Sequence, residues 1–148
     1  MKMKMNRIII HSDGGARGNP GPAAIGVVID SPLGKKTYHE YIGEKTNNEA
    51  EYRALILALK KVKQLYGSEK LAGVNIECYA DSELMVNQLN GKYKIKEAGI
   101  QGFFIEIWNL KIELDADISF HHIERAKNAQ ADELVNQALD KEASKLDL

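Results

Sequence analysis

The sequence predicts an α/β fold in which helices flank one five-stranded mixed sheet. Two observations lead to this prediction. Three strand-like runs follow one another near the N-terminus with only short connections between them, which is typical of an antiparallel meander. From residue 46 onward, segments of helical periodicity separate the two remaining strand-like runs. Because strands joined through helices are expected to be parallel, three antiparallel strands should be followed by two parallel ones, in the order βββαβααβα.

The three strands of the meander are expected over residues 7–12, 23–30 and 35–43. The first two are short and apolar, and the first is rich in β-branched side chains, as buried strands are. The turn sequence SPLG follows the second strand. The third run alternates between polar and apolar residues, which indicates a strand at an edge of the sheet.

The first helix is expected over residues 46–67, where the period of the apolar residues changes. From Leu55 onward, apolar side chains recur at steps of four and three. Thr46 followed three residues later by Glu49 fits a capping box, in which each side chain bonds the backbone N–H of the other residue. Gly67 is a suitable place for the helix to end.

The rest of the chain should supply two strands and three helices. The expected strands are residues 73–80 and 116–123, and the expected helices are residues 81–91, 97–114 and 128–146. The helix over 97–114 contains two glycines, which weaken its helical pattern. Phe103, Phe104 and Trp108 within it are predicted to lie in the core rather than at an interface.

Length and composition limit the class of protein. The 148 residues fit a single domain spanning residues 1–148. With 44% hydrophobic and 28% charged residues, the chain has an ordinary soluble globular composition. No apolar run has the length of a membrane span or a signal peptide, so a cytoplasmic location is expected. Cys78 is the only cysteine, so we expect no internal disulfide and interpret it as a core thiol.

Two aspartates are expected at the carboxyl ends of neighbouring strands. Asp13 ends the first strand, and Asp81 ends the fourth in the sequence CYADSE. If these strands are adjacent and parallel, both carboxylates lie at the sheet edge where ligands bind in open α/β sheets. Asp81 also fits the N-cap of the helix that follows, and both interpretations stay open.

Two more carboxylates are expected on the buried faces of helices. Glu51 shares a helical face with Leu55 and Leu59, and Asp132 heads the closing helix in line with Val135. Favourable interaction with the helix dipole is the alternative explanation for both. A buried carboxylate is costly unless it meets a cation or a donor, and oxygen ligands without a cysteine cluster suit Mg²⁺ or Mn²⁺. Two such ions could clamp the attacking and leaving oxygens of a phosphodiester.

Four segments together resemble the type 1 ribonuclease H family. They are SDGGARGNPGPAAIGVVI with Asp13, TNNEAEYRALILAL with Glu51, YADSELMVNQLNG with Asp81, and NAQADELVNQAL with Asp132. The resemblance follows the family's order and covers nearly the whole chain. It implies a ribonuclease H-like fold and an endoribonuclease that hydrolyses the RNA strand of RNA–DNA hybrids with two metal ions, leaving 5′-phosphate and 3′-hydroxyl ends. It also implies that the four carboxylates hold two Mg²⁺ ions, with Mn²⁺ as a substitute.

The resemblance also indicates residues that contact the hybrid. Glycines such as Gly14 and Gly15 let the main chain approach a nucleic-acid strand, and Asn19 follows in the same turn. Asn47 and Asn48 lie where the first helix starts and could reach a minor groove that displays 2′-hydroxyls. The alternatives are an ordinary hairpin connection and ordinary helix-start chemistry.

The sequence departs from well-known family members after Asp81. It has no long basic, tryptophan-rich protrusion, and only the short sequence GKYKIK remains. Lys92 and Lys94 in this sequence form either a compact phosphate contact or a solvated loop.

A second departure lies in the loop before Asp132. Family members often have a glycine-flanked histidine in this loop, whereas here the loop is short and has no such histidine. Both departures resemble an archaeal-like subgroup with short loops. In the family, that histidine is assigned to the release of product or metal after cleavage. Arg125 or Glu124 is the candidate to replace it here, and Arg125 is the preferred one. His122 belongs to the strand before this loop, on the same face as Ile118 and Phe120, and is predicted at the edge of the core.

Three other functions are consistent with the same residues. The enzyme could also accept double-stranded RNA, or the domain could bind hybrids without cleaving them. A domain of a larger polymerase or integrase is less expected for a chain of this length. Without the four carboxylates the net charge of −1 becomes +3, which fits a nucleic-acid partner. No membrane and no obligatory protein partner are indicated.

Overall fold

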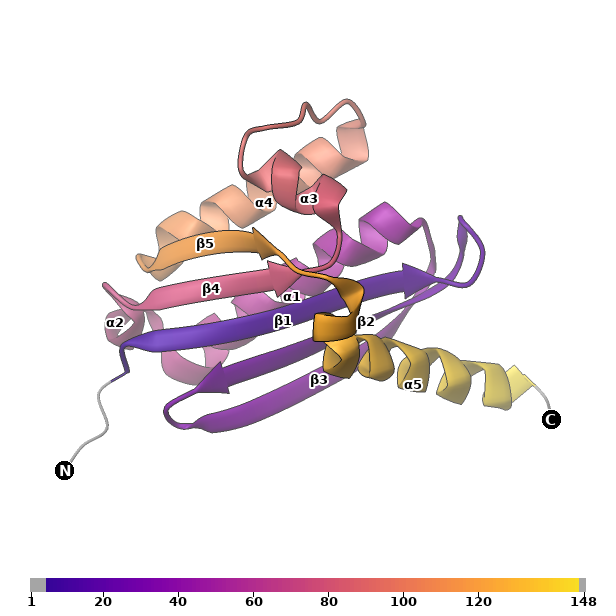
Figure 1. Cartoon of the computed structure of the whole chain (residues 1–148), viewed down its shortest axis with the longest axis horizontal. Helices are drawn as coiled ribbons and strands as arrows, with labels where there is room; N and C mark the ends of the chain where they lie inside the picture. The colour runs from indigo at the N-terminus through magenta and orange to yellow at the C-terminus, as the bar shows by residue number, and fades with distance from the viewer. Residues whose placement is uncertain (1–4, 147–148) are drawn as a thin grey trace.

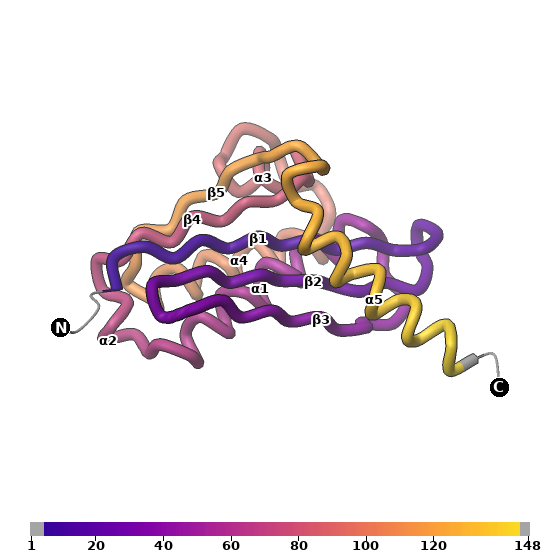
Figure 2. The backbone as a smooth tube through the Cα atoms, turned by 60° about the horizontal axis from the view of Figure 1, so that its bottom comes forward, coloured from indigo at the N-terminus to yellow at the C-terminus, as the bar shows by residue number. Residues whose placement is uncertain are grey.

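The computed structural model of the protein describes residues 5–146, in which five strands form one sheet in the order β3-β2-β1-β4-β5 (Figures 1 and 2). The strands are β1 Arg7–Ala16, β2 Gly21–Ser31, β3 Gly34–Lys45, β4 Asn75–Ala80 and β5 Asp117–His122. Strands β1, β2 and β3 pair antiparallel, whereas β4 pairs parallel with both β1 and β5. The predicted fold class and the edge position of the third strand are confirmed.

Helices cover both faces of this sheet to different extents. They are α1 Asn47–Tyr66, α2 Ser68–Leu71, α3 Glu83–Leu89, α4 Ala98–Leu114, the 3₁₀ turn η1 Arg125–Asn128, and α5 Ala129–Leu146. Helices α1 and α4 lie together behind one face, and α5 crosses β2 and β3 on the other (Figure 1). The sequence analysis missed only α2 and η1, each of four residues.

The main core lies between the sheet and α1. Ile8 and Ile10 of β1 pack with Leu55 and Leu59 of α1, all of them buried. The predicted capping box is present, because Thr46 Oγ1 accepts from the Glu49 N–H at 3.2 Å while Glu49 Oε1 accepts from the Thr46 N–H at 3.3 Å. Gly67 follows the last residue of α1, as predicted, and Cys78 is buried.

Strand β1 does not end at Asp13, contrary to the sequence analysis. It continues to Ala16 because Gly14 and Gly15 keep pairing with β2. The parallel pairing with β4, however, stops at His11 opposite Tyr79, so Asp13 still lies beyond the last parallel pair.

The exposure of two side chains, Trp108 and His122, also differs from expectation. Trp108, predicted in the core, is 55% exposed on the outer side of α4, and His122 is exposed at the end of β5. Within residues 5–146, none of the helices combines the length and the apolar character that crossing a membrane requires.

Candidate functional site

Three carboxylates from different parts of the sequence meet at the ends of β1 and β4. Asp13, Glu51 and Asp81 each place one carboxylate oxygen within 4.8 Å of the others. They lie on β1, on α1 and directly after β4, and together with Asp132 they line a cleft of about 450 Å³. The structure therefore brings all four predicted carboxylates to one cleft, with Asp132 outside the group of three.

Gly14 explains how Glu51 comes so close to Asp13. A Cβ atom at Gly14 would lie 2.2 Å from the carbonyl carbon and oxygen of Ala50 and 2.5 Å from the Glu51 nitrogen. Such separations are far shorter than a van der Waals contact, so only glycine lets β1 and the first turns of α1 touch here. A local requirement of the backbone thus positions two carboxylates.

Gly26 has the corresponding role for the last helix. It is the cross-strand partner of Asp13 on β2, so both residues face the same side of the sheet. A Cβ atom there would lie 2.4 Å from the Ala131 carbonyl oxygen. Helix α5 therefore packs directly onto the sheet, which brings Asp132 to the edge of the cleft. The Arg125 guanidinium lies 3.6 Å from the Asp132 carboxylate.

Burial and mutual repulsion raise the pKa of two of these carboxyl groups. Desolvation, followed by the charge of Asp81, raises the pKa of Asp13 to about 7. Desolvation and then the charge of Asp13 raise the pKa of Glu51 well above its ordinary value. Glu51 Oε2 is also buried and has no hydrogen-bond partner among the described residues. Such a cluster is unfavourable as free anions and suits cations with oxygen ligands.

Asp81 is not the N-cap of α3. Ser82 holds that position, since its Oγ accepts a hydrogen bond from the Met85 N–H at 3.2 Å. The Asp81 carboxylate instead accepts from Asn128 Nδ2 at 3.1 Å, and the same amide nitrogen donates to the Ser12 carbonyl at 2.9 Å.

Asn128 is therefore a residue of the site that the sequence analysis missed. It is only 1% exposed, and it connects the end of η1 to β1 and to the residue after β4. An asparagine four residues before Asp132 carries no local sign of this role. Only the three-dimensional meeting of these segments shows it.

The turn after β1 is fastened to the start of α1. Asn19 Oδ1 accepts from the Asn47 N–H at 3.0 Å, and Asn47 Oδ1 accepts from the Ala16 N–H at 2.8 Å. Both amide oxygens are thus used within the protein, and the side-chain NH₂ groups remain as donors. Asn47 lines the carboxylate cleft, whereas Asn48 lines a neighbouring one.

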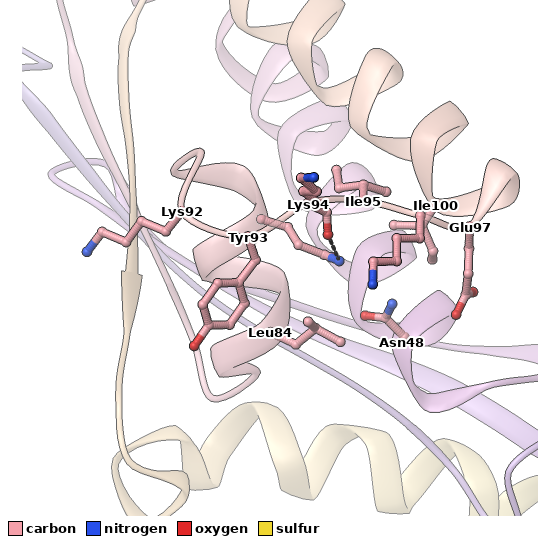
Figure 3. Close-up of a pocket in the computed structure, with 10 residues that line it drawn as sticks. Asn48, Leu84, Lys92, Tyr93, Lys94, Ile95, Glu97 and Ile100 are labelled. Atoms are coloured by element: carbon pink, nitrogen blue, oxygen red, sulfur yellow. Dashed lines mark hydrogen bonds between the residues drawn. The ribbon is translucent and has the colours of Figure 1, made fainter.

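This second cleft has a volume of about 550 Å³ and lies between α3, the start of α1 and residues 92–97 (Figure 3). Lys92 and Lys94 both line it, although Lys92 extends away from the other labelled side chains in the view of Figure 3. Gln88 Nε2 donates to the Lys94 carbonyl at 3.3 Å, which ties the loop to α3. Apart from Asn19, which is exposed in the turn after β1, the predicted contact residues therefore line one of these two clefts.

Comparison with known proteins gives consistent matches. The sequence matches the family described as Reverse transcriptase-like over residues 11–138. Ribonuclease HI of Halobacterium salinarum is 38% identical over 136 residues, which make up 90% of this chain and 65% of that protein. The Bifunctional protein Rv2228c of Mycobacterium tuberculosis is 34% identical over 137 residues, 90% of this chain but 36% of that protein. The chain thus spans about a third of the length of its mycobacterial relatives.

A solved structure extends the match to three dimensions. The crystal structure of LC11-RNase H1 in complex with RNA/DNA hybrid has a TM-score of 0.86 and 48% identity, covering 92% of this chain and 99% of that one. The sequence match, the sheet order and the shared fold agree with one another. The chain therefore belongs to the type 1 ribonuclease H family.

Proposed function

We propose that this protein is an endoribonuclease that hydrolyses the RNA strand of RNA–DNA hybrids. The observation that carries the proposal is the convergence of Asp13, Glu51 and Asp81 within 4.8 Å in a cleft. Its structural relative LC11-RNase H1 was crystallised with an RNA/DNA hybrid, which supports the same substrate class here.

The carboxylates fit divalent cations in number and chemistry. Asp13, Glu51 and Asp81, with Asp132 at the edge of the cleft, would hold two Mg²⁺ ions or Mn²⁺ in their place. When bound, the ions would supply positive charge to the attacking and leaving oxygens of the phosphodiester, and cleavage would leave 5′-phosphate and 3′-hydroxyl ends. Asn128 fixes the orientation of Asp81 through its hydrogen bond.

The two clefts give the hybrid separate contacts. Asn47 lines the carboxylate cleft and is hydrogen-bonded to Asn19, whereas Asn48 lines the second cleft. Lys92 and Lys94 supply positive charge for a phosphate backbone. A substrate contact by the main chain of Gly14 and Gly15 remains part of this proposal, alongside the packing role of Gly14.

A substrate panel tests the proposal. Labelled RNA–DNA hybrid, double-stranded RNA, single-stranded RNA and double-stranded DNA are incubated with the protein, with Mg²⁺ or Mn²⁺ and with a chelator. We expect cleavage of the RNA strand of the hybrid only when a divalent cation is present. Asp13→Asn should abolish cleavage without loss of melting temperature, since it keeps the shape of the side chain and removes a repelling charge.

The same panel separates the alternative functions. Hybrid binding without cleavage by the wild type at any metal concentration would show a silent binding module. Cleavage of double-stranded RNA at a comparable rate would extend the substrate class. Full activity in the chelated protein, or in Asp13→Asn, would overturn the metal mechanism.

A further inference from the structure

Arg17 is a cation of the carboxylate cleft to which neither the fold nor the proposed reaction assigns a role. Among the described residues that line this cleft, Arg17 and Arg125 are the only ones with cationic side chains. Four carboxylates line it as well, and two divalent ions would neutralise their charge. The positive charge of the two arginines would then remain for the phosphates of a nucleic-acid strand.

The guanidinium of Arg17 reaches α5 from the turn after β1. Its Nη2 donates to Asp140 Oδ1 at 2.6 Å and to Asn136 Oδ1 at 3.4 Å. Asn136 lies one helical turn after Asp132 and Asp140 lies one turn further, so the guanidinium is displaced from Asp132 by roughly 6–12 Å along α5. Arg125, by contrast, lies 3.6 Å from Asp132 itself. The two cations therefore occupy different positions along the same cleft.

The backbone of Arg17 is fixed by the turn from which its side chain extends. Its N–H donates to the Pro22 carbonyl at 2.8 Å, and the preceding N–H, of Ala16, donates to Asn47 Oδ1 at 2.8 Å. A Cβ atom at Gly21 would lie 2.3 Å from the Arg17 carbonyl oxygen, so the two sides of the turn touch there. Only the side chain has to move when Arg17 changes its partner.

The ion pair between Arg17 and Asp140 is easily exchanged. The Arg17 side chain is 45% exposed and that of Asp140 is 70% exposed, and such solvated pairs contribute little to stability. Helix α5 does not depend on this pair, because it packs on β2 through Ala24 and Leu139, both of them buried. A guanidinium binds a phosphate with two parallel hydrogen bonds, as it binds a carboxylate. In the free protein, Asp140 therefore occupies a place that fits a phosphate.

We propose that Arg17 holds a phosphate of the RNA strand that is close to the scissile phosphate but distinct from it. The phosphate replaces Asp140 as the partner of the guanidinium. This inference rests on the proposed cleavage of hybrids, because that reaction places the RNA strand in the cleft. Since the contact is to the backbone, it should raise the affinity for all base sequences alike. Arg17 thus positions the substrate and takes no part in breaking the bond.

Hybrid binding without cleavage tests the contact. In an Asp13→Asn background, in which no cleavage is expected, Arg17→Ala should weaken binding of a labelled hybrid by about tenfold at low salt. The slope of log Kd against log salt concentration should fall by roughly one, because one phosphate contact is lost. Arg17→Lys should recover only part of the affinity, because an ammonium binds phosphate as a point charge. Lys70→Ala, on α2 before the start of β4, is the charge-matched control remote from the cleft and should change neither quantity.

Asp140→Asn separates a phosphate contact from a structural tie. Removal of the competing charge of Asp140 should strengthen hybrid binding by about two- to fivefold and leave the melting temperature nearly unchanged. If the ion pair instead holds α5 in place, Asp140→Asn and Arg17→Ala should both lower the melting temperature and both weaken binding, which would overturn the proposal.

Steady-state kinetics make the same distinction in the otherwise wild-type enzyme. Arg17→Ala should raise KM and leave kcat within about twofold, because the phosphate contact is made equally before and during the reaction. A loss confined to kcat would mean that Arg17 acts on the carboxylates rather than on the substrate, and would overturn the proposal.

A scan of the phosphates locates the contact. Each hybrid carries one uncharged methylphosphonate in its RNA strand, next to a 2′-deoxynucleotide that the reference strand also contains. Arg17→Ala should lose its effect on binding at one position near the scissile phosphate and keep it at the others, because a missing charge cannot be lost twice. An effect that persists in full at every position of the RNA strand would overturn the contact.

Failure of this contact and failure of the proposed function are distinguishable. A wild type that cleaves the hybrid, together with an Arg17→Ala variant that binds it equally well, would overturn the contact alone. A wild type that neither binds nor cleaves the hybrid would overturn the proposed function and the contact with it.

Discussion

At the scale of single residues, two glutamates two positions apart have opposite roles. Glu49 closes the capping box of α1 with Thr46, whereas Glu51 is turned into the carboxylate cleft. The sequence distinguishes them, because the spacing from Thr46 assigns the cap to Glu49 and leaves Glu51 without a structural partner. The unsatisfied Glu51 Oε2 and the raised pKa of Glu51 agree with that assignment.

The two glutamates therefore predict a contrast between matched variants. Glu49→Gln should leave the cleavage rate nearly unchanged and cost about 1 kcal/mol or less of stability, because glutamine also closes a capping box. Glu51→Gln should lower the rate of hybrid cleavage by orders of magnitude while the protein stays folded, because it removes a metal-binding charge. Steady-state cleavage assays and thermal unfolding of both variants make the comparison. Similar losses of activity would show that the two roles have been confused.

Arg125 is the residue whose role depends most on the proposed chemistry. Its side chain is 79% exposed and lies 3.6 Å from the Asp132 carboxylate, so it contributes little to stability in this position. A guanidinium can hold a phosphate with two parallel hydrogen bonds, which the ammonium of lysine cannot do. We therefore place it at the scissile or a neighbouring phosphate during turnover.

Substitution of Arg125 should reduce turnover rather than metal binding. Arg125→Ala is expected to lower the multiple-turnover rate about tenfold or more, and Arg125→Lys should recover only part of it. The metal concentration needed for half-maximal activity and the melting temperature should barely change. Lys127→Ala, in the same exposed turn, is the matched control. Wild-type turnover by Arg125→Ala would leave Glu124 or His122 as the candidate.

At the scale of elements, periodicity predicts the long helices because helices such as α1 and α4 bury one face. The helical spacing from Leu55 onward is a local consequence of burial, so it is visible in the sequence. The alternation of residues 35–43 belongs to an edge strand in which no residue is fully buried. The length of β1 is not visible in the sequence, since Gly14 pairs in a strand only because β2 lies beside it. Short elements such as α2 and η1 have too few residues to show a period.

The functional site also has parts that the local sequence predicts and parts that depend on residues remote in sequence. The meeting of its carboxylates could be predicted, because two of them follow neighbouring strand-like runs and two head the apolar faces of helices. Asn128 could not be predicted, because its partners are the Ser12 carbonyl and Asp81, which are remote in sequence. The exposure of Trp108 was also unpredictable, since an aromatic residue on a helix shows its environment only once the packing partners are known.

The contact between β1 and α1 makes a prediction at this scale. Gly14→Ala should destabilise the protein by about 1–3 kcal/mol, because its Cβ would overlap the backbone of Ala50 and force the strand and the helix apart. Gly15→Ala is the matched neighbour, since its Cβ would meet only Val135 Cγ1 at 3.6 Å, an ordinary contact. Chemical denaturation of both variants measures the difference. Equal stability of the two would mean that α1 can move away from β1 at little cost.

At the scale of the whole molecule, the carboxylate cleft couples stability to protons and metal. The pKa of Asp13 is raised to about 7, whereas in the unfolded chain an aspartate titrates near its ordinary value of about 4. Between these pH values the folded state binds more protons than the unfolded state. The free energy of unfolding therefore falls as the pH rises through this range in the absence of metal.

Metal-free protein should accordingly melt at a lower temperature at pH 8 than at pH 5, and Mg²⁺ should reverse the loss at pH 8. Mg²⁺ binds the ionised site of the folded state, and at 100 times its dissociation constant it would add about 2.7 kcal/mol to the free energy of unfolding. At pH 5 the gain should be smaller, because protons compete for the same oxygens.

Calorimetry with chelator and with Mg²⁺, at both pH values, gives the four melting temperatures. Asp13→Asn should flatten the pH dependence and reduce the effect of Mg²⁺, whereas Glu69→Gln, at an exposed glutamate on α2, should change neither. If wild type and Asp13→Asn respond alike, the cleft does not control the stability of the molecule, and the pH dependence must originate elsewhere.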